Sequence, residues 1–156
     1  MKSIPTQSLT RRLSDVARHV VIPDGVVTTG WPEVEAQCRE MGLSFPEWQA
    51  GMGRLALGKR KDGKYAASVG GVVWSIPRQV VKTFLVRAIV FALCILHPGL
   101  TVLWTAHRTR TATETFRKLQ GFARRSKVAA HVLSVRSANG EQAIEFRNGS
   151  RILFGA

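Results

Sequence analysis

The residues with the clearest chemical potential are Lys82-Thr83, which open an apolar helix directly after an apolar segment. In a P-loop, a glycine-rich turn between strand and helix cradles phosphate with its backbone N–H groups and the helix dipole. The lysine neutralises phosphate charge, and the Ser or Thr after it holds Mg²⁺. Ile76 and Val81 stand where the general pattern has glycine. Taken alone, the pair fits either a phosphate site or an ordinary helix start with an exposed lysine.

The elements that must position this pair are predicted from hydrophobic patterns. A Val- and Gly-rich run over 65–76 predicts a buried strand, 77–81 a loop, and 82–96 a helix that is apolar on nearly all sides. The run 101–105 does not alternate, which predicts a strand buried on both faces. Residues 110–125 predict an amphipathic helix. Its inward stripe is Ala112, Phe116, Leu119 and Ala123.

Further elements flank this unit on both sides. Periodicity and turn residues upstream predict helices over 8–20, 32–42 and 46–58, with 21–31 as a loop or extended arm. The first of these carries its apolar stripe at Leu9, Leu13, Val16 and Val20. Downstream, Asn-Gly pairs at 139–140 and 148–149 predict hairpin turns. They join short strands over 131–136, 142–147 and 151–154. The fold class is therefore α/β, with N-terminal helices, a βαβα unit and a short antiparallel meander.

Composition limits the kind of partner and compartment. The chain has 156 residues, 45% of them hydrophobic, and 23 Lys and Arg against 10 acids give a formal charge of +13. This balance favours nucleic acid first and an anionic membrane surface second. Cys38 and Cys94 lie too far apart for a zinc motif, so reduced thiols are expected. The run 84–96 is too short to span a bilayer, and no signal peptide is evident, which indicates a soluble intracellular protein.

Basic residues recur on the helix predicted over 110–125. Arg110, Arg117 and Arg124 are seven residues apart and share one face, and Arg125 and Lys127 extend the charge. This face could contact a DNA backbone or could simply be solvated. The histidines in this part of the chain lack a ligand partner at i+3 or i+4 and are taken as ordinary polar residues; they are His107 and His131.

Residues 77–83 (PRQVVKT) are similar to the variant P-loop of phage terminase large subunits, a P-R-Q-x-G-K-T pattern that lacks the first glycine. Residues 29–32 (TGWP) and 45–49 (FPEWQ) look like the family's upstream segment, in which Trp-Gln packs against adenine. Residues 104–116 resemble its next strand-to-helix segment, and 139–154 its hairpin before the acidic motif. The resemblance begins near residue 16 and implies an incomplete P-loop NTPase-type fold.

The resemblance implies ATP and Mg²⁺ as cofactors and assigns the site residue by residue. Trp48 and Gln49 would contact adenine, although Trp48 could instead be a core residue beside a surface glutamine. Lys82 and Arg78 would be the catalytic residues, with Arg78 sensing the γ-phosphate unless it is only a salt-bridged loop residue. Thr83 would hold Mg²⁺ through the nucleotide. The nucleotide-binding set is Trp48, Gln49, Pro77, Arg78, Gln79, Val80, Val81, Lys82 and Thr83.

The chain departs from the family in two respects. Val81 replaces the glycine before the lysine, where backbone must approach phosphate closely, so we expect weakened nucleotide binding. The family also needs an acidic pair at the end of a later strand, and no such pair follows the P-loop. Glu114 is expected to pair with Lys118 four residues later, and Glu141 and Glu145 are expected to be solvated.

These observations predict a helical arm over 1–45 and the N-terminal part of a P-loop ATPase domain over 46–156, truncated before the acidic strand. The expected function is the ATP-binding portion of a viral motor that packages double-stranded DNA, not hydrolytically competent alone. Expected family partners are the small terminase subunit and the portal protein, in the host cytoplasm and without a membrane. The alternative is a non-catalytic, basic DNA-binding remnant of a prophage gene.

Overall fold

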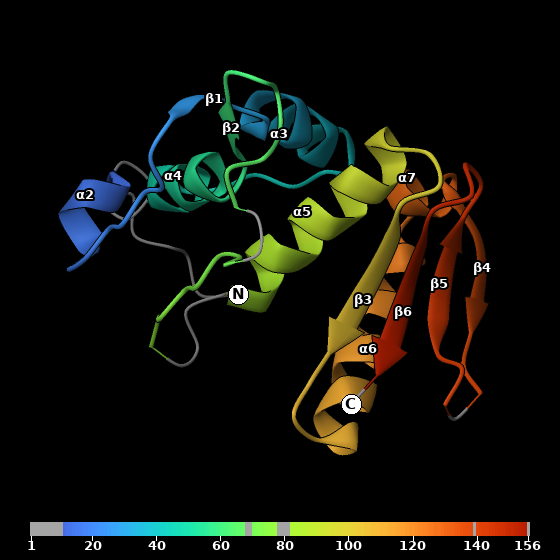
Figure 1. Cartoon of the computed structure of the whole chain (residues 1–156). Coiled ribbons are helices and arrows are strands. Elements are labelled where there is room, and N and C mark those ends of the chain that lie inside the picture. Colours follow the sequence, from blue (N-terminus) through green and yellow to red (C-terminus); the bar gives the residue numbers. More distant parts are fainter. Residues whose placement is uncertain (1–10, 68–69, 78–81, 139, 156) are drawn as a thin grey trace. The chain divides into compact units, whose positions relative to one another are not determined.

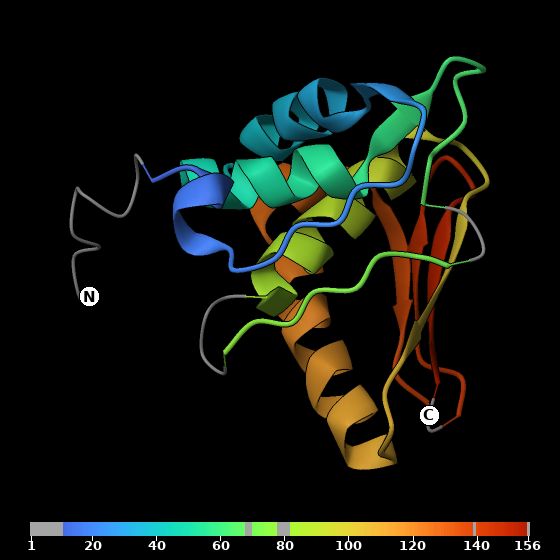
Figure 2. The same ribbon diagram turned by 60° about the vertical axis from the view of Figure 1, so that its left-hand side comes forward.

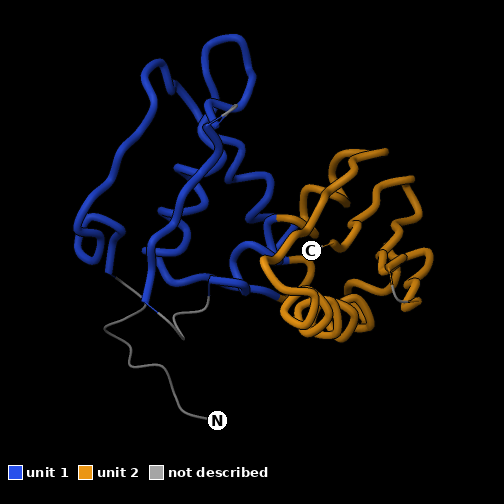
Figure 3. The backbone as a smooth tube through the Cα atoms, turned by 60° about the horizontal axis from the view of Figure 1, so that its bottom comes forward, with its two compact units in different colours: residues 1–39, 43–89 blue, residues 40–42, 90–156 orange. Residues whose placement is uncertain are grey.

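The computed structural model describes residues 11–67, 70–77, 82–138 and 140–155. It is mixed α/β, which confirms the predicted class, and contains helices and two sheets (Figure 1). The chain divides into two compact units (Figure 3): unit 1 is Met1–Arg39 with Leu43–Ile89, and unit 2 is Glu40–Gly42 with Val90–Ala156. This division into compact units does not test the predicted domain boundary near residue 45, which stays a prediction.

Unit 1 is built mainly from helices, and the bounds of all but the first agree closely with the predicted ones. Its helices are α2 (Leu13–Val16), α3 (Trp31–Glu40), α4 (Glu47–Ala56) and the first half of α5 (Lys82–Leu96). Pro32 lies in the first turn of α3, where a missing N–H costs nothing. Gly42, at φ 77°, follows the helix in the left-handed conformation typical of a helix end.

A fully buried tryptophan organises the core of unit 1. Trp31 is 1% exposed, and its ring centroid lies 5.4 Å from that of Phe45. Gly53 of α4 faces the indole so closely that a Cβ there would overlap the ring. Gly51, two residues earlier, similarly lies against Leu13, whose Cβ would be 2.8 Å from an added Cβ. The two helical glycines therefore let α3 and α2 approach the backbone of α4.

The segment predicted as a loop or extended arm over 21–31 contains a short strand. β1 (Val26–Thr29) pairs antiparallel with β2 (Gly58–Arg60), and the register shifts between Val26 and Thr28. Strands this short carry little periodic signal, because their pairing partner lies about thirty residues away in the chain. The sequence therefore had no local pattern from which to predict the pair.

The helix predicted over 8–20 is wrong in its described part beyond Val16. Within the described part only Leu13–Val16 are helical, as α2, and Leu13 of the predicted apolar stripe packs against Gly51. Val16 and Val20 are 44% and 46% exposed. An apolar stripe stabilises a helix only where another surface covers it, so the helix ends where its cover ends. Leu9 lies outside the described residues.

The buried strand predicted over 65–76 is also wrong for its described residues. Apart from an isolated bridge between Lys59 and Tyr65, residues 65–67 and 70–77 form no strand. Val73 is 87% exposed, and Gly71 has a left-handed φ of 64° that interrupts an extended run. A strand needs a neighbour to satisfy its backbone, and β-branched composition alone does not supply one.

Unit 2 combines the second half of α5 with a four-stranded sheet and two further helices. The helices are α6 (Thr109–Ala123) and α7 (Ser126–Ala129). The strands are β3 (Thr101–Thr105), β4 (Val132–Arg136), β5 (Ala143–Phe146) and β6 (Arg151–Gly155). Their spatial order is β3-β6-β5-β4 (Figure 1). The antiparallel meander β4-β5-β6 is confirmed, and β6 pairs parallel with β3.

Helix α6 covers one face of this sheet (Figure 2). Its predicted inward stripe is confirmed, since Ala112, Phe116, Leu119 and Ala123 are all buried. Phe116 meets Phe154 of β6 at 5.0 Å between ring centroids. The prediction that β3 is buried on both faces is wrong: its exposure alternates, and Leu103 is 67% exposed. Because α6 covers one face of the sheet and neighbouring residues of a strand point to opposite faces, every second residue of β3 is exposed.

The turn at Asn148-Gly149 also completes the end of α5. The Asn148 amide donates to the carbonyls of Cys94 and Ile95, at 2.9 and 3.0 Å. The Ser150 hydroxyl donates to the His97 carbonyl at 2.7 Å. The last carbonyls of a helix have no partner within the helix. A turn predicted from its hairpin signal therefore also caps a helix about fifty residues earlier.

Two global expectations can be compared with the described residues. No helix among them is long and apolar enough to cross a membrane.

Cys38 and Cys94 are free and buried. Burial raises the pKa of each thiol to about 12, and Glu35 adds to the shift at Cys38. Both thiols are therefore poor nucleophiles at neutral pH.

Glu145 was predicted to be solvated, and the structure shows it partly exposed but also hydrogen-bonded. Its side chain is 29% exposed, accepts a hydrogen bond from the Ser134 hydroxyl at 2.6 Å and pairs with Arg136. The Ser134 hydrogen bond is the main cause that lowers the pKa of Glu145 below its ordinary value, and Arg136 acts in the same direction. The three side chains meet because the antiparallel register places Ser134 opposite Glu145.

Replacing Gly53 by Ala is expected to destabilise the chain by about 2 kcal/mol, because the overlap with Trp31 outweighs the gain of about 1 kcal/mol in helix propensity. Urea unfolding measures the change. The matched control is Gly121→Ala in α6, since Gly121 has nothing within 4 Å of an added Cβ. It should stabilise by about 0.5–1 kcal/mol. Equal effects at both glycines would contradict the packing.

Glu145→Gln should lower stability at neutral pH and leave it unchanged in acid. A carboxyl group whose folded pKa is lowered stabilises the fold above its unfolded pKa. That contribution disappears as the pH falls below about 4.5 and through the lowered folded pKa. Unfolding curves of the two proteins should therefore converge on acidification. A difference that stays constant with pH would show that the carboxylate charge is not involved.

Candidate phosphate-binding site

Lys82 is the first residue of α5, and its side chain folds back over the segment that precedes the helix. Its Nζ donates a hydrogen bond to the carbonyl of Ile76 at 2.8 Å. Lys82 and Thr83 are both exposed, and within the described chain Lys82 has no ion pair. An ammonium group has three protons, so two stay available for an anion. A cation and a hydroxyl thus stand together at the positive end of a 15-residue helix.

Most of the predicted loop cannot be compared with the structure. Arg78, Gln79, Val80 and Val81 lie outside the described residues, so their predicted roles stay predictions. Pro77, the last described residue before this segment, is exposed. The strand that a P-loop places before its turn is absent over 70–77, as described above. What the structure supplies is Pro77 and the start of α5 with Lys82 and Thr83.

Aromatic packing brings the predicted adenine segment to the first turn of α5. The ring centroids of Phe45 and Phe84 lie 5.5 Å apart, and the Phe45 ring also contacts Trp31. Phe45 comes three residues before Trp48, and Phe84 directly follows Thr83. Segments more than thirty residues apart in the chain therefore lie side by side. The guanidinium carbon of Arg87 lies over the Phe84 ring, 5.4 Å from its centroid.

Trp48 and Gln49 differ in their surroundings. Trp48, in the first turn of α4, is half-buried. Gln49 is only 3% exposed, and its Oε1 has no hydrogen-bond partner among the described residues. A buried polar atom without a partner costs about 1–3 kcal/mol, and such atoms commonly meet a water or a ligand. Gln49 therefore has acceptor capacity that these residues leave unused.

The acidic residues give no sign of a catalytic pair. Glu114 was predicted to pair with Lys118, but its Oε1 lies 3.3 Å from Nε of Arg110, one turn earlier. Both pairings have the same spacing along the helix, so the pattern alone could not choose between them. Glu141 is exposed, as expected, and Glu145 is held by Ser134 and Arg136. Over the described ranges no three His, Cys, Asp or Glu side chains are grouped to hold a metal.

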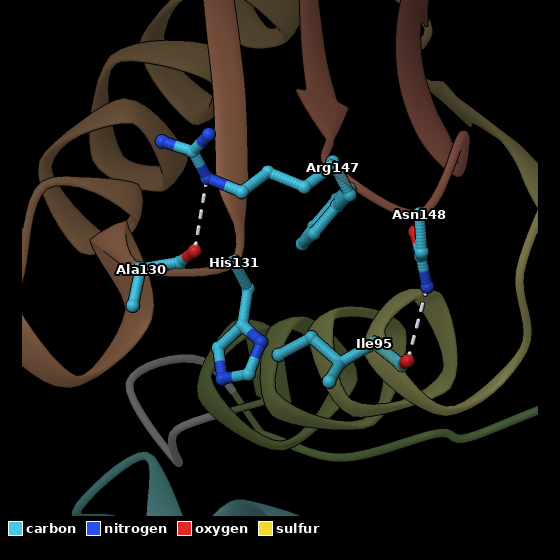
Figure 4. A pocket seen from close by; sticks show the side chains of 6 residues that line it. Ile95, Ala130, His131, Arg147 and Asn148 are labelled. Carbon is cyan, nitrogen blue, oxygen red and sulfur yellow. Dashed lines mark hydrogen bonds between the residues drawn. The ribbon is translucent and has the colours of Figure 1, made fainter.

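Two depressions lie within unit 2. The smaller, about 190 Å³, is lined by Ile95, Ala130, His131, Phe146, Arg147 and Asn148 (Figure 4). Its polar groups are largely occupied, because Arg147 donates to the Ala130 carbonyl at 3.1 Å and Asn148 caps α5. The larger, about 560 Å³, is lined by Thr109, Ala112, Thr113, Gly140, Gln142, Phe154 and Gly155. Neither includes a residue predicted to bind nucleotide.

Reasoning from sequence missed three participants of the site. Phe45 and Phe84 join its two halves, and an aromatic residue next to each motif was a signal that could have suggested the contact. The carbonyl of Ile76 gives no such signal, because any residue has one.

Comparison with known proteins finds no family model, no curated protein and no solved structure that this chain matches.

Gln49→Met is expected to raise the stability of the ligand-free chain by about 1 kcal/mol, because it removes a buried acceptor without a partner and keeps a similar shape. Thermal or urea unfolding without nucleotide measures the change. Gln120→Met is the matched control: the Gln120 amide donates to Ser137 at 3.3 Å near the surface. A loss of stability in Gln49→Met would show that Gln49 has a partner outside the described residues.

Proposed function

We propose that this chain is the ATP-binding portion of a terminase large subunit, the motor that packages double-stranded DNA into viral procapsids. The observation that carries the proposal is the placement of Lys82. Its ammonium contacts the Ile76 carbonyl at the start of α5, and Thr83, the next residue, is exposed, so that an incoming phosphate would meet the cation together with helix N–H groups. The similarity of residues 77–83 to the family's variant P-loop gives this general anion site its specific interpretation.

The proposal gives each described residue a physical task. Lys82 neutralises the phosphates with the two protons that Ile76 does not use. The Thr83 hydroxyl is a hard oxygen ligand suited to Mg²⁺, which also takes oxygens from the nucleotide. Trp48 offers a partly accessible ring for the adenine base, and Gln49 offers an unused acceptor oxygen for its amino group. The Phe45–Phe84 contact keeps the two halves of the site adjacent.

The proposal assigns weak binding rather than turnover to this chain. Val81 in place of glycine would strain the loop by about 1–3 kcal/mol. That strain corresponds to roughly one to two orders of magnitude in affinity. Arg78 would sense the γ-phosphate, but the acids Glu114 and Glu145 are paired with arginines and have no place in hydrolysis. In the motor, the partners would be DNA, the small terminase subunit and the portal, in the host cytoplasm.

A second candidate is a basic DNA-binding protein that no longer binds nucleotide. The charge of +13 favours it, and so does Val81. The two candidates differ in their response to ATP. The first requires stabilisation by ATP and Mg²⁺, whereas the second requires DNA binding that is indifferent to ATP.

ATP with Mg²⁺ at about ten times its Kd should stabilise the chain by about 1.4 kcal/mol, which raises Tm by roughly 3–6 °C. Lys82→Ala should abolish the shift, because it removes the phosphate cation. Lys64→Ala, at an exposed turn lysine, is the matched control and should keep it. Val81→Gly should give a larger shift at the same ATP concentration. A shift that survives Lys82→Ala would place the nucleotide elsewhere, and no shift even in Val81→Gly would favour the second candidate.

A further inference from the structure

The exposed side of α6 carries a row of cations. Arg110, Arg117 and Arg124 are all exposed, and residues seven apart on a helix lie about 10 Å apart along nearly one line. Arg125 and Lys127 at the start of α7 are exposed as well. We call these five residues the basic face. It lies away from the buried stripe of α6, so the charges are available without disturbing the core.

Most of this charge is uncompensated. The acid on α6 that contacts the row is Glu114, and it is paired with Arg110 at 3.3 Å. Arg117 and Arg124 take part in none of the ion pairs found within the described ranges. Arg125 lies over the Phe122 ring at 5.3 Å and keeps its charge toward solvent. A polyanion would therefore meet Arg117 and Arg124 first, with Arg110 the weakest contributor.

A glycine interrupts this face at its centre. Gly121 lies four residues after Arg117 and three before Arg124, so it shares their side of the helix. It is exposed, and a Cβ added there would meet nothing within 4 Å. Glycine inside a helix is destabilising, and no packing of the described chain requires it here. The missing side chain opens a place where another backbone can approach the helix closely.

The basic face also lacks the rings that single strands require. Binding of single-stranded nucleic acid relies on bases stacking on accessible aromatic side chains. The aromatic residues of α6, Phe116 and Phe122, are each 2% exposed. Arginines at regular spacing without aromatics match contacts to phosphates of a duplex, which position a protein without reading sequence.

We propose that the basic face binds the phosphate backbone of double-stranded DNA without sequence preference, and that the strand approaches the helix at Gly121. The inference deepens the proposed function and rests on it for the choice of DNA as the polyanion. It adds which surface of the chain holds the duplex and by which contacts.

The test measures binding of the full chain to a fluorescent duplex of about 30 base pairs, without ATP, between about 50 and 200 mM salt. Arg117→Gln with Arg124→Gln should lower the slope of log K against log salt by about two, because each phosphate contact contributes about one. Lys61→Gln with Lys64→Gln removes the same charge from an exposed turn of unit 1 and should leave the slope nearly unchanged.

Gly121→Leu separates binding from folding. Leucine favours a helix over glycine, so Tm should rise, while the added side chain should weaken duplex binding by about threefold or more. Equal loss of slope in the two double variants would overturn the assignment of the surface. Unchanged binding in Gly121→Leu would overturn the approach at Gly121.

Two further probes test whether the basic face prefers a single strand or an anionic membrane to the duplex. A single strand of the same length should bind more weakly than the duplex, and vesicles with about one third phosphatidylserine should not compete at equal phosphate. Tighter binding of either one would overturn the proposal. The DNA-binding assay contains no ATP, so a negative result in it does not contradict ATP binding at α5. A negative result for ATP binding likewise does not contradict DNA binding by the basic face.

Discussion

The burial of α5 is the constraint on which most of the structure depends. A 15-residue helix whose charged residues are Lys82 and Arg87 cannot remain in water, because nearly all its sides are apolar. Its first half packs within unit 1, where Phe84 meets Phe45 and the Cys38 thiol approaches the Ala88 carbonyl at 3.6 Å. Its second half packs within unit 2, where Phe91 contacts Phe122 and Phe146. Covering this helix organises both cores.

The two ends of α5 differ in the described residues around them, and this difference supports the proposed phosphate site. At the C-terminal end, carbonyls without helical partners are capped by Asn148 and Ser150. At the N-terminal end, Lys82 and Thr83 leave a positive end facing solvent. An end that is capped internally has no further binding capacity, whereas an open N-terminus with a lysine attracts an anion. The proposed phosphate site is therefore the end of α5 for which the described residues supply no cap.

The sequence predicted those parts of the fold that follow from a local period. The bounds of α5 and α6 and the meander β4-β5-β6 follow from helical periodicity and turn residues. The predictions over 65–76 and 8–20 were wrong, and the one over 21–31 did not include its strand pairing, because each depended on a distant neighbour. Within the described residues Val73 has no strand beside it, Val16 is only partly covered, and β1 finds its partner at β2. At the site, the motif residues could be named in advance, but the Phe45–Phe84 contact and the Ile76 carbonyl could not.

The central claim is that nucleotide meets the chain at the first turn of α5. Titration of isotope-labelled protein with ATP and Mg²⁺, followed by NMR, tests this most directly. The account predicts saturable shifts of the Thr83 and Phe84 amides together with the Trp48 indole, whereas inorganic triphosphate should shift only the two amides. Saturable shifts confined to other residues, or none at concentrations of several millimolar, would contradict it.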